Sequence, residues 1–248
     1  MEVWAGVWVV ALVAILVGTV LQRLSGTGVG LVCAPVLALL LGSAPGVLVT
    51  NATTTVSGFL IMLSVRRFVD WRRAAVICLA AVPGAIAGAL VVRALPAAWL
   101  QVVIGGVVLL GVLLTVATPR LPDVRSRFAL ATAGTVGGFL NTAAGVAAPA
   151  MVIYSRLSRW EQRSFAATLQ PVFMTMGFLS VTSKTLLGAA PVTPPAWVLP
   201  AVVLTVLLGA LLGGIAAARV RTEHARALAL VLAGTGAAVT LVRGVLAL

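Results

Sequence analysis

Residues 26–35 read GTGVGLVCAP, a stretch in which glycines alternate with other residues inside an apolar run that ends in a proline. A glycine-rich loop that binds a dinucleotide follows a β-strand and needs an acidic residue about 20 positions later, and a P-loop continues into a lysine. Here the first acidic residue after Glu2 is Asp70, and no lysine follows the glycines. The stretch therefore favours an interrupted membrane helix, with close helix packing as the alternative for any single glycine.

Composition places this stretch in a membrane. The chain has 248 residues, of which 61% are hydrophobic and 9% are charged, and its mean hydropathy is +1.18. A soluble domain is usually about 45–50% apolar, whereas a spanning helix needs roughly 20 largely apolar residues in a row. We therefore expect an all-α polytopic membrane protein. Its N-terminal apolar run begins with an acidic residue rather than a basic one, so we expect a retained helix and not a signal peptide.

The apolar runs, cut at charges, prolines and glycines, predict ten helical segments. These are residues 3–22, 27–41, 45–63, 74–93, 98–116, 127–140, 143–155, 164–183, 196–216 and 225–243. The loops after the third, fifth, seventh and ninth segments are rich in arginine, which places them in the cytoplasm and both termini outside. Arg93, Lys184 and Arg243 are interpreted as anchors at the membrane interface. The net charge of +12 then reflects topology and attraction to membrane lipids, and nucleic acid is not expected as a partner.

The two halves of the chain resemble each other in the order of their features. Each has a break of small residues, an Ala-Pro pair, a connection, and a polar patch that opens a helix. Each half contains five segments, an odd number, so the second copy must enter the membrane upside down. We therefore predict two inverted repeats with broken helices, residues 1–116 and 128–248, joined by a cytoplasmic linker at 117–127. Such repeats place the substrate site of a secondary transporter near the membrane midplane.

Helices that restart after a break present unpaired N–H groups and a partial positive charge, which together favour an anion. The predicted binding residues are therefore the polar and small residues at the two breaks and on the next helix: Arg23, Thr27, Gly28, Gly30, Asn51, Thr54, Asn141, Thr142, Gly145, Thr168 and Gln170, with Pro35 and Pro149 marking the breaks. The alternative is that the hydroxyl groups bond back to their own helices. Arg23 either faces the site or extends to the cytoplasmic interface.

Acidic residues and the single histidine lie at termini or in loops, so the predicted helices contain no proton relay. An anion leaving a cell gains about 2.3 kcal/mol per charge per 100 mV, which allows export on the membrane potential alone. Import would need a co-transported cation. No nucleophile, base and orienting group can be assembled, and the two cysteines suggest neither a disulfide nor a zinc site, so we expect no enzyme, metal or cofactor.

The glycine-rich break, the Ala-Pro that follows it, TNATTTVSGF at residues 50–59, DWRRA at residues 70–74 and the repetition in the second half together resemble the sulfite exporter TauE/SafE family. This resemblance implies a multi-pass permease of the bacterial inner membrane for a small anion, such as sulfite, an organosulfonate or a carboxylate, generally regarded as an exporter. A cation-coupled anion importer and an anion channel are the alternatives. The oligomeric state is open, with a homo-oligomer among the alternatives.

Overall fold

A computed structural model describes residues 2–26, 29–117, 122–189, 196–217 and 219–248. The described residues form ten α-helices and one short 3₁₀ helix, which confirms the all-α prediction: α1 Glu2–Ser25, α2 Gly30–Leu41, α3 Ser43–Val65, η1 Arg66–Phe68, α4 Trp71–Ala94, α5 Ala97–Val116, α6 Arg127–Ala144, α7 Ala148–Leu157, α8 Gln162–Leu186, α9 Val198–Ala216 and α10 Thr222–Leu246. Each predicted segment corresponds to one α-helix, and the segment predicted for residues 143–155 also includes Ala143 and Ala144 at the end of α6. Seven of the helical segments are long and apolar enough to cross a membrane.

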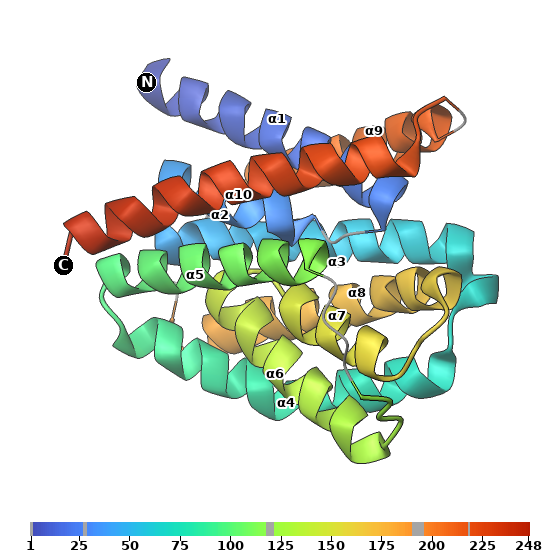
Figure 1. Ribbon diagram of the computed structural model, residues 1–248. Coiled ribbons are helices and arrows are strands. Elements are labelled where there is room, and N and C mark those ends of the chain that lie inside the picture. Colours follow the sequence, from blue (N-terminus) through green and yellow to red (C-terminus); the bar gives the residue numbers. More distant parts are fainter. Residues whose placement is uncertain (1, 27–28, 118–121, 190–195, 218) are drawn as a thin grey trace.

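The arginine-rich connections lie at one end of the bundle. In Figure 1 the links from α3 to α4, from α7 to α8 and from α9 to α10 lie at the right, whereas both termini and the link from α4 to α5 lie at the left. We call these the arginine-rich end and the opposite end. Thr115, Arg156 and Arg226 meet at the arginine-rich end, where both arginines donate hydrogen bonds to the Thr115 carbonyl oxygen at 3.2 and 3.4 Å.

The central crossing joins α3 and α8, which run antiparallel. Gly58 of α3 lies so close to α8 that an added Cβ atom would come within 2.8 Å of the Gln170 carbonyl oxygen. Gly177 of α8 lies so close to α3 that an added Cβ atom would come within 2.6 Å of the Asn51 carbonyl oxygen. The spacing from Asn51 to Gly58 equals that from Gln170 to Gly177, so each helix contacts the other through equivalent positions.

The crossing of α5 and α10 has the same reciprocal form. A Cβ atom on Gly105 would lie 2.7 Å from the Ala237 carbonyl oxygen, and one on Gly244 would lie 3.0 Å from the Ala98 carbonyl oxygen. The spacing from each alanine to the glycine of its own helix is the same as in the α3–α8 crossing. Small residues at both crossings let the backbones approach closely, as is usual where membrane helices pack.

Two further pairs of helices, α1 with α9 and α4 with α6, are parallel and also correspond. A Cβ atom on Gly213 of α9 would lie 2.8 Å from the Arg23 Cβ atom of α1, and one on Gly88 of α4 would lie 2.9 Å from the Thr142 Cβ atom of α6. If α1–α5 are matched in order with α6–α10, then α1 corresponds to α6 and α4 corresponds to α9. The contact between α1 and α9 therefore corresponds to the contact between α6 and α4. The packing of the two halves is therefore reciprocal at every crossing described.

We predict that Gly177→Ala destabilises the fold, because the new methyl group would contact the Asn51 backbone at 2.6 Å, too close without moving a helix. Overpacking of this kind typically costs about 1–3 kcal/mol, and each kcal/mol lowers the Tm of a chain of this size by about 2–4 °C. Thermal unfolding of the purified protein in detergent measures this shift. Gly106→Ala is the matched control, since a Cβ atom there meets nothing within 4 Å. Equal Tm values for the two variants would contradict the close crossing.

Candidate functional site

Two pairs of amide side chains are buried at the α3–α8 crossing. Gln22 of α1 donates through Nε2 to Oε1 of Gln170 at 3.0 Å, and Asn141 of α6 donates through Nδ2 to Oδ1 of Asn51 at 3.1 Å. The four side chains are at most 2% exposed. Asn51 in turn donates through Nδ2 to the Ser180 hydroxyl at 2.7 Å. Amide groups in a setting without water must be bonded internally, so these pairs hold α1 to α8 and α6 to α3.

Helix ends of the same kind place both pairs. The N–H of Gly26 donates to the Gln22 carbonyl oxygen at 2.9 Å, and the N–H of Gly145 donates to the Asn141 carbonyl oxygen at 2.8 Å. Both glycines have a positive φ, 71° and 77°, and a glycine in the left-handed region is a common way to end a helix. Gln22 and Asn141 therefore occupy the same position in the last turn of α1 and of α6.

The helices that restart after the breaks are short. With 12 and 10 residues, α2 and α7 are about 18 and 15 Å long, roughly half of a 30 Å hydrocarbon layer. Their first turns line one small cavity, where Gly30 and Ala148 lie with Asn141 and Thr54. Its volume is about 10 Å³, which holds one water molecule at most. The helix starts therefore converge, but a small oxyanion does not fit between them in this conformation.

A larger cavity of about 570 Å³ reaches the amide groups from the arginine-rich end. Gln22, Arg23 and Gln170 line its inner part, and Glu161 and Arg163 line its outer part. The Arg23 side chain thus faces this cavity beside the Gln22–Gln170 pair, and its Nη1 donates to the Ser64 hydroxyl at 2.8 Å. The Gln22 Oε1 atom has no hydrogen-bond partner among the described residues. The cavity accordingly ends at one of the two amide pairs and not at the other.

A neighbouring cavity of about 260 Å³ adds two further arginines, Arg156 and Arg226, at the same end. The ion pairs of the described residues involve four other arginines, Arg73, Arg125, Arg159 and Arg221. The carboxylate of Glu161 accepts hydrogen bonds from the N–H groups of Arg163 and Ser164, both at 2.7 Å, and these bonds lower its pKa. Glu161 is thereby tied to the start of α8, and the cavities keep an excess of positive charge that attracts anions.

A family model for the sulfite exporter TauE/SafE matches residues 10–240. The chain belongs to the sulfite exporter TauE/SafE family. No curated protein and no solved structure matched it. Membership of this family indicates a membrane transporter of sulfur anions such as sulfite, which agrees with the apolar helices and with the positively charged cavity.

The structure brings together most of the residues predicted to bind substrate in this TauE/SafE transporter. Gly30, Asn51, Thr54, Asn141, Thr142, Gly145 and Gln170 are all buried at the centre. Thr54, however, donates to the carbonyl oxygen of Thr50 in its own helix at 2.8 Å, which is the alternative raised for the hydroxyl groups. Gln22 was not among the predicted residues, although it forms one of the two amide pairs. Thr27 and Gly28 lie outside the described residues.

Thr168 and Pro35 have other surroundings than expected, whereas Pro149 lies next to its break. Thr168 accepts a hydrogen bond from the N–H of Asp70 at 2.9 Å, so it anchors the start of α4 at the arginine-rich end. Pro35 lies inside α2 rather than at the break, which precedes Gly30. Pro149 lies in the first turn of α7, where a missing N–H costs no helical hydrogen bond.

The structure corrects the interpretation of Lys184 as an anchor at the membrane interface. Its side chain is fully buried, at 0% exposure, in the last turn of α8. Its Nζ atom has no hydrogen-bond partner among the described residues. The sequence indicated that a lysine stands near a helix end, but only the packing shows that this lysine points into the TauE/SafE bundle.

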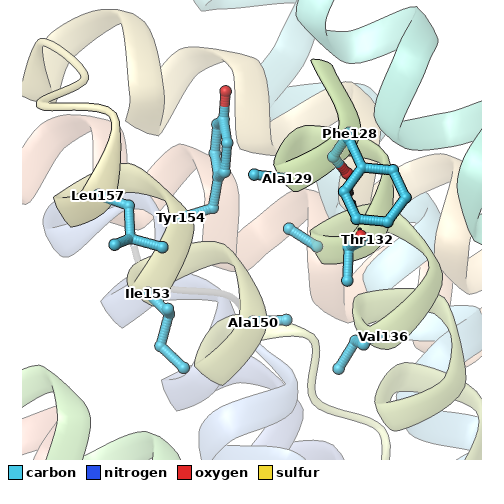
Figure 2. Close-up of a pocket in the computed structure, with 9 residues that line it drawn as sticks. Phe128, Ala129, Thr132, Val136, Ala150, Ile153, Tyr154 and Leu157 are labelled. Atoms are coloured by element: carbon cyan, nitrogen blue, oxygen red, sulfur yellow. Dashed lines mark hydrogen bonds between the residues drawn. The ribbon is translucent and has the colours of Figure 1, made fainter. Parts of the chain in front are cut away.

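An apolar cavity of about 370 Å³ between α6 and α7 is less suited to an anion (Figure 2). Figure 2 shows Phe128, Thr132 and Val136 of α6 opposite Ile153 and Leu157 of α7. The lining contains no charged side chain, and an anion would lose its hydration there without gaining a charged partner. The amide pairs therefore remain the candidate site for an anion in this TauE/SafE chain.

We predict that a double-mutant cycle will detect the hydrogen bond between Gln22 and Gln170 as an interaction energy. Methionine is similar in volume to glutamine. Each of the variants Gln22→Met and Gln170→Met alone leaves the opposite buried amide without its partner, at a cost of about 1–3 kcal/mol. The double variant should be less destabilised than the sum of the two, by about 0.5–3 kcal/mol. Thermal unfolding of the four proteins measures the cycle. Strict additivity would mean that the two amides do not interact.

Proposed function

We propose that the protein exports a small sulfur-containing anion, such as sulfite, from the cytoplasm by alternating access between two inverted halves, with the membrane potential supplying at least part of the driving force. The observation that carries this proposal is the unequal access to two equivalent amide pairs. The cavity of about 570 Å³ at the arginine-rich end reaches Gln22 and Gln170, whereas the cavity that Asn141 of the other pair lines has a volume of about 10 Å³. In a transporter of this design, the state open to the other side would have these roles exchanged.

The reciprocal packing supports the inverted repeats. The antiparallel crossings, α3 with α8 and α5 with α10, each pair one helix with its counterpart from the other half. Two equivalent helices that cross antiparallel at equivalent residues are expected where a two-fold axis lies in the membrane plane. The two hydrogen-bonded amide pairs correspond in the same way, since Gln22 matches Asn141 and Gln170 matches Asn51.

The distribution of arginine supports an inward-open state. Lysine and arginine accumulate in cytoplasmic loops, and the arginine-rich end carries the open cavity. At the opposite end, Val92, Leu100, Ala143 and Ala189 pack into a buried apolar cluster. We infer that the cavity faces the cytoplasm of a cell whose inner membrane holds the protein, and that the apolar cluster closes the outer side.

The chemistry of the cavity suits an anion with several oxygen atoms. Arginine and amide N–H groups donate hydrogen bonds to such oxygens, and the cavity offers both at its inner end. For one net negative charge, a potential of 100 mV is worth about 2.3 kcal/mol, which corresponds to roughly a fifty-fold concentration ratio. Export therefore needs no coupled ion.

Flux from proteoliposomes loaded with sulfite tests this proposal. A potassium gradient with valinomycin sets the potential, and liposomes without protein give the background. We expect efflux to rise when the interior is made negative, to saturate with sulfite concentration, and to show exchange of labelled for unlabelled substrate. Flux equal to the background would contradict the proposal. A strict need for a sodium or proton gradient would favour a coupled importer, and flux without saturation or exchange would favour a channel.

We predict that Gln170→Met lowers sulfite efflux about 10- to 100-fold, because a hydrogen bond to a charged group is worth about 1.5–3 kcal/mol. The matched control is Thr235→Val, which changes an exposed side chain that bonds to its own helix on α10 and should leave efflux unchanged. Both variants are compared at equal amounts of folded protein in the same proteoliposome assay. Wild-type efflux from Gln170→Met would place the anion elsewhere.

A further inference from the structure

We propose that Lys184 lines the outer vestibule when the transporter opens outward, and that it provides the positive charge that the departing anion meets there. This inference rests on the proposed alternating access. It assigns a binding role to a side chain that is sealed inside the protein in the present conformation.

The α3–α8 crossing fixes the position that is equivalent to Lys184. Asn51 corresponds to Gln170, and Gly58 corresponds to Gly177, through the reciprocal backbone contacts. Continuing along both helices with the same spacing, Val65 at the end of α3 corresponds to Lys184 near the end of α8. Val65 lines the open cavity at the arginine-rich end. If the halves exchange conformations, Lys184 takes the corresponding place in a cavity that opens at the other end.

Contacts of α1 and α6, which are independent of the α3–α8 crossing, also indicate which residues would line the outer cavity. Arg23 of α1 packs on Gly213, and Thr142 of α6 packs on Gly88 in the equivalent way. Arg23 lines the open cavity, so Thr142 is expected to line its closed counterpart. The Thr142 hydroxyl oxygen is buried and, like Lys184 Nζ, has no hydrogen-bond partner among the described residues. Of the four unpartnered buried side-chain atoms in the described part of the chain, two thus fall on the positions that exchange would open.

Each vestibule would then contain one cation beside its amide pair, but from a different helix. On the inner side the cation is Arg23 of α1, which donates to Ser64, the neighbour of Val65. On the outer side the α6 position is a neutral threonine, and the α8 position carries the ammonium group of Lys184. A transported anion would therefore find a positive charge beside an amide pair at both ends of its path.

The described residues offer the Lys184 ammonium group no hydrogen-bond partner, and the acidic side chains that the structure describes lie elsewhere. Glu161 and Asp70 cap the starts of α8 and α4 at the arginine-rich end, and α8 is 25 residues long, so its ends lie about 37 Å apart. Asp123 and Glu223 form ion pairs with arginines. One turn before Lys184 lies Ser180, which accepts a hydrogen bond from Asn51. A buried ammonium without a counter-ion is costly at membrane depth, and an anion passing the Asn51–Asn141 pair would supply one.

Sidedness of cysteine labelling tests the location. In a background with Cys33→Ala and Cys78→Ala, the variants Lys184→Cys and Val65→Cys are treated with a membrane-impermeant maleimide on spheroplasts and on inside-out vesicles, without sulfite present. We expect Val65→Cys to react from the cytoplasmic face, and Lys184→Cys to react from the outer face at least tenfold faster than from the cytoplasmic face. Reaction of Lys184→Cys only from the cytoplasmic face, or from neither, overturns the proposal. Thr142→Cys should behave like Lys184→Cys and replaces it if that variant does not fold.

Chemical restoration of the charge tests the role. The Lys184→Cys variant should export sulfite at least tenfold more slowly than its background. Alkylation of the cysteine with 2-bromoethylamine rebuilds an ammonium group and should restore most of the flux. Alkylation with iodoacetamide adds a neutral group and should not restore it. Equal flux from the two alkylated proteins means that Lys184 has no charge-dependent role. The labelling does not depend on transport, so the two proposals can fail separately. A protein that exports no sulfite but is labelled at Lys184→Cys from the outer face would contradict sulfite export and still support the outer vestibule. A protein that exports sulfite but is not labelled there from the outer face would contradict the outer vestibule and still support sulfite export.

Discussion

The whole structure depends on how backbone and amide groups are satisfied where no water is available. Within a bilayer, every unpaired N–H or C=O group costs several kcal/mol, so a helix can be interrupted only where other protein groups meet it. Here α1 and α6 end in left-handed glycines whose N–H groups return to Gln22 and Asn141. The side chains of these two residues then bond across to α8 and α3. The breaks and the amide pairs are therefore parts of one arrangement.

Close crossing of α3 and α8 makes that arrangement possible. Gly58 and Gly177 bring the two backbones within reach of each other, and the amide residues stand beside the contact. Because both crossings of equivalent helices are antiparallel, the same local structure occurs twice in opposite directions. Access differs between the two copies: a cavity of about 570 Å³ reaches one pair, and the cavity at the other pair has a volume of about 10 Å³. A difference of this kind is what alternating access requires of two equivalent halves.

Much of the helical fold could be predicted from the sequence because charges interrupt the apolar runs at nearly regular intervals. The face that a residue presents could not be predicted in the same way. Gln22 precedes Arg23 at the end of an apolar run and was not among the predicted binding residues, although it is buried against α8. Thr168 was grouped with Gln170, but residues two apart on a helix point in different directions, and Thr168 meets Asp70 instead. Lys184 was interpreted as an anchor at the membrane interface, but its side chain is fully buried in the protein.

The central claim is that the two ends of the bundle open in alternation. Distances between spin labels, measured by double electron–electron resonance in lipid, address it most directly, with one pair across the inner cavity between α1 and α8 and one across the outer closure between α6 and α3. The account predicts that sulfite shifts part of the population to a shorter inner distance together with a longer outer distance. Distances that stay fixed at both ends, or that lengthen at both ends together, would contradict it.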